Sequence, residues 1–340
     1  MDKLDWKILE ILDWNGRMPI SKLAQRVGSN KDVVAYRMKK LEQEKNIVRY
    51  YPLLDMQKLG YHTSRIMFDL EELEPEKERE FIHFLDKKIN AGLIFRMDYP
   101  YRYGILLWTK SVYDVEQIII KIKQKLGKAL IKYTYSLFCT YKLYPKDYLF
   151  GKNLHERHVT FAPRAAVKHD NNDYKILKEL AHDARLSTVQ IAQRLRIPQT
   201  TVSHKIKQLE KHGIILGYRA EINFIQLGFM NYFLEIYLDD NTTIKQIENW
   251  ANANIHVMWL QKVIGTCDIE IEVEVKNRVE LELLLNELRS KFTHIRKIVF
   301  FSQEYKKFTF LPFVEPELQH GYEKKLRRIV RGKHFSGLNL

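Results

Sequence analysis

Residues 5–26 read DWKILEILDWNGRMPISKLAQR, and residues 173–194 repeat this stretch as DYKILKELAHDARLSTVQIAQR. The match extends without a gap from residues 5–60 onto residues 173–228 at a constant offset of 168, and about 17 of the 56 aligned pairs are identical. This spacing is much longer than the roughly 20 to 50 residues of a solenoid unit. The chain of 340 residues is therefore predicted to be a duplicated, two-part protein.

Each copy begins with the pattern of three short helices. In the first copy, Leu4, Ile8 and Leu12 have helical spacing, and a second short apolar helix follows. The helical pattern is then interrupted at residues 28–30. The third helix then carries apolar residues at i, i+4 and i+7, namely Val34, Met38 and Leu41 in the first copy and Val202, Ile206 and Leu209 in the second. One face of this helix should pack on the first two helices, which leaves the opposite face free.

The free face of the third helix carries amide, hydroxyl and cationic side chains. Such groups reach base edges and phosphates when the second helix of a helix-turn-helix enters a major groove. The candidate DNA-binding residues are Lys31, Tyr36, Arg37, Lys39 and Lys40 in the first copy and Gln199, Thr200, Thr201, Ser203, His204, Lys205 and Lys207 in the second. Residues 46–51 and 213–219 are predicted to form a short hairpin, the wing, beside each set of helices.

The charge distribution agrees with an anionic partner for these segments. The chain has 56 Lys and Arg against 42 Asp and Glu, a net charge of +14. Residues 1–60 hold 12 basic and 8 acidic residues, and residues 171–230 hold 9 and 5. Residues 231–319 hold 10 basic and 14 acidic residues, which favours a self-association or small-molecule role for that part.

The remainder of each copy has the order strand, helix, strand, strand, helix, strand, which predicts a ferredoxin-like α+β domain. Residues 233–238, 256–260 and 269–275 are expected to be strands, and residues 244–253 and 281–288 helices, with a last strand around residue 299. The strict alternation of Ile269–Val275 predicts a strand that is buried on one face only.

The repeated segment resembles the winged helix-turn-helix of the Lrp/AsnC transcription regulators. The resemblance rests on DYKIL at 173–177, ARLS at 184–187, LEKHGII at 209–215, Gly217-Tyr218 and the closing Leu227-Gly228. In the first copy, Lys45 and Arg49 replace the glycines at 213 and 217. The resemblance implies tandem units of a winged helix-turn-helix and a ferredoxin-like effector and oligomerisation domain, as in prokaryotic regulators that bind double-stranded DNA.

In that family a Gly-x-x-Asp turn lies where a small-molecule effector such as an amino acid binds between subunits. The resemblance therefore implies Gly265 and Asp268 as effector-binding residues. Asp is also a common turn residue that bonds its own backbone, so a purely structural role is the alternative. In the first copy Arg102 occupies the position of Asp268, and that ligand site is expected to be lost or to take an anion.

The predicted boundaries are 1–60 for the first winged helix-turn-helix and 61–144 for the first, degenerate ferredoxin-like domain. A linker at 145–170, a second winged helix-turn-helix at 171–228 and a second ferredoxin-like domain at 229–314 follow, with a basic tail at 315–340. The linker holds His155 and His158, but no further ligand lies at a suitable spacing, so no metal site is expected. The two cysteines are far apart, and no secretory signal or membrane span is apparent, so a cytoplasmic protein is predicted.

No catalytic or cofactor-binding motif is found, so neither a catalytic residue nor a cofactor is expected. One enzyme class stays open, because siroheme decarboxylases resemble Lrp/AsnC proteins in fold and some are fusions of two such units. In that alternative Arg96, Tyr101 and Arg102 would bind porphyrin carboxylates. The favoured interpretation is a DNA-binding regulator that acts as an intramolecular pseudo-dimer or homo-oligomer and reads two half-sites.

Overall fold

A computed structural model describes residues 1–151, 158–309 and 311. The same order of elements occurs twice along the chain. The first repeat consists of α1 (Lys3–Trp14), α2 (Ile20–Val27), α3 (Lys31–Gln43), β1 (Ile47–Leu54), β2 (His62–Leu70), α4 (Pro75–Lys87), β3 (Leu93–Met97), β4 (Tyr103–Thr109), α5 (Val112–Leu126) and β5 (Leu130–Leu143). The second repeat consists of α6 (Asn171–His182), α7 (Thr188–Leu195), α8 (Gln199–Lys211), β7 (Ile215–Ile222), β8 (Met230–Leu238), α9 (Ile244–Ala253), β9 (Val257–Ile264), β10 (Ile269–Val275), α10 (Arg278–Lys291) and β11 (Ile295–Phe308). The α+β architecture predicted from the sequence is confirmed.

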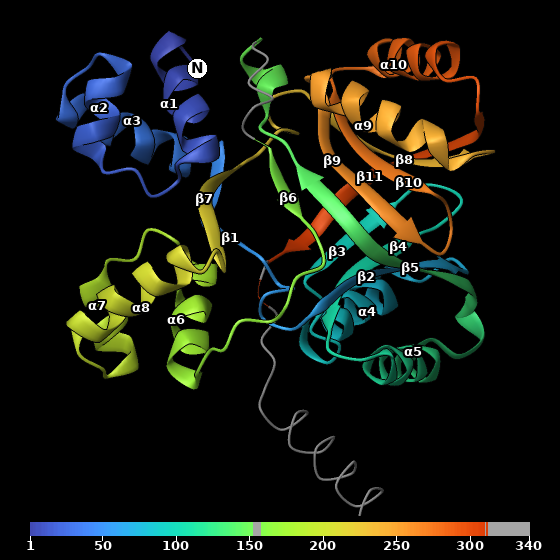
Figure 1. The fold of residues 1–340 in the computed structure, drawn as a ribbon, viewed down its shortest axis with the longest axis horizontal. Coiled ribbons are helices and arrows are strands. Elements are labelled where there is room, and N and C mark those ends of the chain that lie inside the picture. The colour runs from blue at the N-terminus through green and yellow to red at the C-terminus, as the bar shows by residue number, and fades with distance from the viewer. Residues whose placement is uncertain (152–157, 310, 312–340) are drawn as a thin grey trace, which may run out of the picture.

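The three helices that open each repeat form a small bundle around the predicted apolar positions. Ile8, Leu12 and Val34 are fully buried in the first bundle, and Ile176, Leu180 and Val202 are their counterparts in the second. Asp2 caps α1 and Asp170 caps α6, each in a capping box with the acidic residue three positions later. The two bundles lie on the same side of the molecule, above and below each other in Figure 1.

Strands β1 and β7 pair with each other, so the predicted wing hairpins are wrong. The two strands run antiparallel, with Tyr50 opposite Ala220 and Tyr51 opposite Arg219. They form a two-stranded sheet between the two bundles (Figure 1). Each strand finds its hydrogen-bonding partner in the other repeat instead of folding back on itself.

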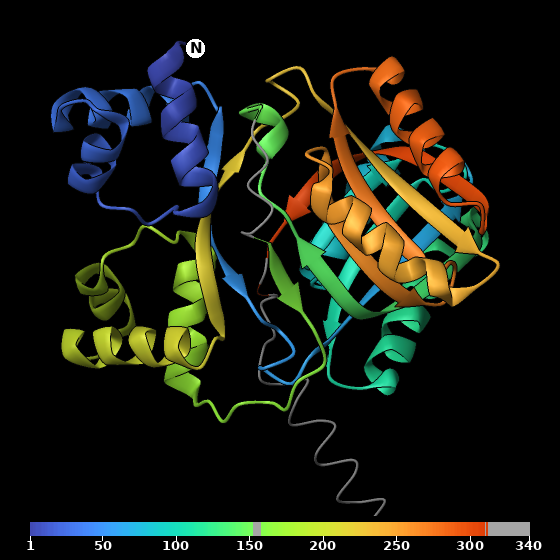
Figure 2. The ribbon, with the colours of Figure 1, turned by 45° about the horizontal axis from the view of Figure 1, so that its top comes forward.

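The other strands close into a ring of eight, in the order β2, β4, β3, β11, β8, β10, β9 and β5, with β5 returning to β2. The long strands β5 and β11 join the two repeats. The first part of β5 pairs with β2 and its second part with β9, while β11 pairs first with β8 and then with β3. Helices α4, α5, α9 and α10 cover the outside of this ring (Figures 1 and 2).

The predicted linker at residues 145–170 is more than a connection. It contains a short 3-10 helix, η2 (Asp147–Leu149), and a strand, β6 (Val159–Phe161), that pairs with the end of β5. Phe161 is fully buried and stacks on Tyr141 with ring centroids 4.4 Å apart. His158 packs near Tyr144, whereas His155 lies outside the described residues. Within the described part, no helix is both long and apolar enough to cross a membrane.

Both faces of β10 are buried, which corrects the prediction of a strand buried on one face. Its isoleucines and valines pack under α9 and α10, and Glu270, Glu272 and Glu274 point into the ring. Glu270 forms an ion pair with Arg65 of β2, and Glu272 accepts a hydrogen bond of 2.6 Å from the Tyr305 hydroxyl. Closure of the ring by the other repeat therefore buries a face that would be solvated in an open sheet.

Burial raises the pKa of these carboxyl groups. The pKa of Glu270 rises to about 7, although Arg65 acts in the opposite direction, and burial also raises the pKa of Glu272 and of Glu235 on β8. A carboxyl group whose pKa is raised in the folded state contributes stability that is complete below its unfolded pKa and is lost as the pH rises through the folded pKa.

We therefore expect these groups to lower the free energy of unfolding between pH 5 and pH 8. Glu235→Gln should stabilise the protein more at pH 8 than at pH 5, because it removes a charge that burial opposes and keeps an acceptor for Tyr237. Urea unfolding at both pH values measures this. The matched control is Glu304→Gln on β11, whose side chain is 54% exposed, so this substitution removes no buried charge. An equal effect of the two substitutions would contradict the assignment.

Candidate nucleic-acid interface

Helices α3 and α8 are the second helices of the two helix-turn-helix units. The turn before α3 contains Gly28 with φ +70°, and the equivalent turn before α8 contains Arg196 with φ +54°. This left-handed residue ends the preceding helix and redirects the chain within a few residues. Asn30 then caps α3 by accepting a hydrogen bond of 2.8 Å from the Val33 N–H. Both helices bury the predicted apolar stripe and expose the opposite face.

Most of the candidate DNA-binding residues lie on these exposed faces. On α3, Tyr36 is 66% exposed, Lys31 and Lys39 are also exposed, and Lys40 is partly exposed beside Glu44. On α8, the exposed candidates are Gln199, Thr200, His204 and Lys207, and the half-buried ones are Thr201 and Ser203. The exposed face of α3 is thus richer in cations, and that of α8 is richer in amide and hydroxyl groups.

Two of the predicted contact residues, Arg37 and Lys205, form ion pairs within their own bundles. Arg37 forms an ion pair with Asp2 at 2.7 Å, and its equivalent Lys205 binds Asp170 at 2.7 Å and Asp173 at 2.9 Å. In spite of partial burial, the two carboxylates hold the pKa of Lys205 above its ordinary value. Both cations tie the exposed helix to the start of the first helix of its own bundle. We therefore leave Arg37 and Lys205 out of the proposed DNA contacts.

Two equivalent arginines, Arg17 and Arg185, cross between the bundles. Arg17 donates a hydrogen bond of 3.1 Å to the Leu186 carbonyl and lies over the ring of Tyr218. Arg185 donates one of 2.8 Å to the Gly16 carbonyl and lies over the ring of Tyr50. These reciprocal contacts, together with the β1–β7 pair, fix the position of α3 relative to α8.

The sequence repeat contained this signal, but its role was missed. Arg17/Arg185, Tyr50/Tyr218 and Glu42/Glu210 are all identical pairs of the alignment. The hydroxyl of each tyrosine donates a hydrogen bond of 2.8 Å to the glutamate of its own repeat, so each tyrosine is held in place beneath the arginine of the other repeat. These identities mark the contact between the repeats and not the DNA-facing surface.

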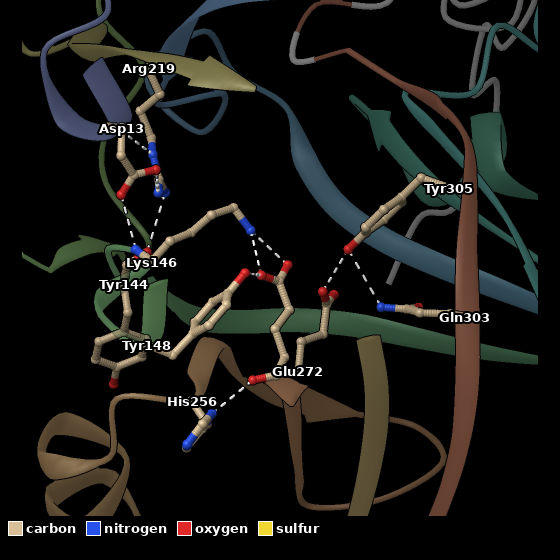
Figure 3. A network of polar contacts seen from close by, with 10 residues as sticks. Asp13, Tyr144, Lys146, Tyr148, Arg219, His256, Glu272, Gln303 and Tyr305 are labelled. Carbon is tan, nitrogen blue, oxygen red and sulfur yellow. Dashed lines mark hydrogen bonds and ion pairs between the residues drawn. The ribbon is translucent and has the colours of Figure 1, made fainter. Parts of the chain in front are cut away.

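A buried network joins the bundles to the ring (Figure 3). Arg219 of β7 pairs with Asp13 of α1, and its guanidinium also donates to the Tyr144 carbonyl at 3.2 Å. The Lys146 N–H donates to the second Asp13 oxygen at 2.9 Å, and the Lys146 ammonium lies 2.6 Å from Glu274 inside the ring. Tyr148 also donates to Glu274. Charged groups of the bundle pair and of the ring interior therefore contact one segment between them.

The two candidate effector residues also have structural uses. A Cβ atom at Gly265 would lie 2.2 Å from the Tyr135 carbonyl oxygen, so only glycine allows β5 to approach this turn. The Asp268 carboxylate accepts a hydrogen bond of 2.8 Å from the Leu238 N–H. Arg102 occupies the same place in the first repeat, since its N–H donates to the Phe68 carbonyl as the Asp268 N–H donates to Ile236.

Two of the three residues suggested for a porphyrin, Arg96 and Tyr101, lie on opposite sides of their sheet. Tyr101 is buried inside the ring near Phe301, with ring centroids 6.0 Å apart. Arg96 lies on the opposite face of its sheet, where it is 3.6 Å from Glu78 of α4 and half exposed. The predicted grouping of Arg96 with Tyr101 is therefore wrong. No cluster of metal-ligating side chains occurs among the described residues.

The paired bundles and their exposed helices define a helix-turn-helix DNA-binding protein. The AsnC-type helix-turn-helix domain matches residues 1–42, and a winged helix-turn-helix DNA-binding domain matches residues 169–215. An uncharacterised HTH-type transcriptional regulator of Pyrococcus abyssi is 30% identical over 140 residues, which cover 41% of this chain and 87% of the relative. The chain belongs to the Lrp/AsnC family of transcription regulators.

Two further comparisons differ in how much of the chain they cover. The proline dehydrogenase transcriptional activator of Rhodobacter capsulatus is 28% identical over 130 residues, which cover 37% of this chain and 84% of the relative. A siroheme decarboxylase crystal structure superposes with a TM-score of 0.63 at 13% identity, covering 96% of this chain and all of that one. At this identity the second likeness shows a shared fold over both repeats.

Removal of one crossing arginine should loosen the bundle pair. Arg185→Ala removes two hydrogen bonds to carbonyl groups and a cation–π contact, so we expect a loss of about 2 kcal/mol in the free energy of unfolding. Arg194→Ala is the matched control, because it removes an exposed pair with Glu179 and should cost less than about 1 kcal/mol. Denaturant titration of both variants gives the comparison, and equal losses would count against the crossing contact.

Proposed function

We propose that this protein is a sequence-specific transcription regulator that binds double-stranded DNA through α3 and α8 together, in the cytoplasm. The observation that carries the proposal is the fixed pairing of the two helix-turn-helix units by Arg17, Arg185 and the β1–β7 sheet. In this arrangement one chain supplies the two reading helices that other helix-turn-helix proteins obtain by dimerisation. The chain thus acts as an intramolecular pseudo-dimer.

The two reading faces are chemically different and should perform different tasks. Lys31, Lys39 and Lys40 on α3 are suited to phosphate contacts, which give affinity without sequence information. Gln199, Thr200 and His204 on α8 are suited to hydrogen bonds with base edges. A homodimer would present the same face twice, whereas this chain should read two unlike half-sites.

A small-molecule effector is part of the proposal, and the turn at 265–268 is its candidate site by family resemblance. One oxygen of the Asp268 carboxylate accepts the hydrogen bond of the Leu238 N–H, and a ligand would use the other oxygen. A ligand bound there would lie beside the end of β8. A catalytic role is not proposed, because relatives are named as transcription regulators and two of the porphyrin-binding candidates, Arg96 and Tyr101, lie on opposite sides of their sheet.

The charge-rich face of α3 predicts a specific salt dependence. Lys39→Ala combined with Lys40→Ala should reduce the slope of log affinity against log salt concentration by up to about 2, because two phosphate contacts are lost. Fluorescence anisotropy with a fixed duplex at several salt concentrations measures the slope. The charge-matched control is Lys121→Ala combined with Lys128→Ala, which changes one exposed residue on α5 and one just after it. An unchanged slope in the first double variant would remove α3 from the interface.

Selection of bound sequences from random duplex DNA tests directly whether the protein recognises two unlike half-sites. We expect enrichment of a gapped motif with two unlike halves, and Gln199→Ala should relax the preference in one half only, since it changes α8 alone. A symmetric motif would contradict unequal half-sites. Failure to enrich any motif, combined with tight binding of siroheme and its absorbance band, would favour the enzyme alternative.

A further inference from the structure

A pocket lies where the second helix-turn-helix bundle meets the ring, and the proposed function leaves it without a use. Its volume is about 640 Å³, and it opens to solvent. Arg49 of β1 and the last residues of α6 contribute on the bundle side, and α4 and the end of β11 contribute on the ring side. The pocket is distinct from the turn at 265–268 and from the exposed faces of α3 and α8.

The less exposed part of the lining combines apolar surface with two cations. Ile82 and Phe308, both partly exposed, supply the apolar wall, and the buried Ile94 and Ala181 lie behind it. Arg49 has a 25% exposed side chain and donates to the Phe308 carbonyl, while Lys307 has a 17% exposed side chain and lies 2.6 Å from Asp86. Arg49 also pairs with Glu221 of β7. Both cations are therefore held in place beside apolar side chains.

The outer part of the lining is basic. Its exposed members are Arg79, His83, Lys87, His182 and Lys306. Asp86 is the one carboxylate among the described lining residues, and Lys87 and Lys307 share it at 2.8 and 2.6 Å. Their attraction holds the pKa of Asp86 below its ordinary value, although burial alone would raise it.

The carboxylates that pair with the other rim cations lie outside the lining. Arg79 pairs with Glu76, with both side chains more than 70% exposed, and Lys306 pairs with Glu304, which is 54% exposed. Exposed pairs of this kind contribute little and exchange readily with another anion. Within the lining itself, five Lys and Arg side chains and two histidines accompany the one carboxylate of Asp86.

We infer that this pocket binds an organic anion, a molecule with a carboxylate, sulfonate or phosphate group on an apolar body of about the size of a fused ring. The apolar walls suit the body, and the cations suit the charged group. An inorganic ion would leave the apolar walls uncovered. A ligand with its own ammonium group would meet the excess of cations.

A bound anion would contact both the bundle pair and the ring. Arg49 lies on the strand that pairs with β7, and its guanidinium already reaches Phe308 at the end of β11. A ligand between Arg49 and Lys307 therefore adds a second connection across the same junction. Because this binding requires no DNA, it can be tested independently of the proposed reading of two half-sites.

Isothermal titration with 2-naphthoate, compared with the uncharged 2-naphthalenemethanol, tests the inference on the full chain. We expect the acid to bind at least about tenfold more tightly than the alcohol. The variant Arg79→Gln/Lys87→Gln/Lys306→Gln should bind the acid at least about tenfold more weakly than the unchanged chain. Its charge-matched control, Lys121→Gln/Lys128→Gln/Lys245→Gln, changes exposed residues far from the lining in sequence and should bind the acid normally.

Three results would overturn the inference: no heat of binding up to the solubility limit of 2-naphthoate, equal affinity for the acid and the alcohol, or equal loss in the rim variant and its control. The thermal unfolding midpoints of both triple variants establish that they are folded. Five of the six substituted side chains are exposed and that of Lys306 is 27% exposed, so we expect midpoints close to that of the unchanged chain.

Discussion

The ion pair between Arg219 and Asp13 is the contact on which the arrangement of the molecule most depends. Both side chains are only 2% exposed, and the guanidinium bonds Asp13 of α1 and the Tyr144 carbonyl from its place on β7. It thus holds together the first bundle, the second bundle and the segment that follows β5. A buried pair of this kind gains little over an apolar contact, yet loss of one partner leaves an uncompensated charge. The pair also occurs once, because the offset of 168 residues places Tyr51 and Ala181 at the equivalent positions.

The two repeats are related by approximate symmetry, but they carry different residues at several equivalent positions. Arg17 and Arg185 make the same contacts in both directions, and the long strands β5 and β11 cross between the repeats in the same manner. The interior of the ring is unequal, because β10 contributes three glutamates where β4 has Gly104, Leu106 and Trp108. The crossing arginines and the tyrosines beneath them are therefore the same in both repeats, whereas the ring interior and the exposed faces of α3 and α8 differ.

The sequence predicts the elements of this fold well, because periodicity is local. The positions of α9 and β10 match their predicted ranges of 244–253 and 269–275. Partners that are distant in sequence are not predictable in the same way. A single strand such as β1 carries no local mark of pairing with β7, so a hairpin was the natural but wrong expectation. Likewise, helical spacing puts Arg37 and Lys205 near the exposed face, and only the fold brings them to the acidic caps of the first helices.

Pairing within one chain also changes how such a regulator responds to its own abundance. The strands that two separate subunits would offer each other are already joined here, through β1 with β7, β3 with β11 and β5 with β9. Assembly of the reading unit is therefore unimolecular, and dilution does not take it apart as it does a dimer. Under the proposed function, occupancy of a site would follow the first power of protein concentration. The joined strands also leave none of these edges for pairing with another family member.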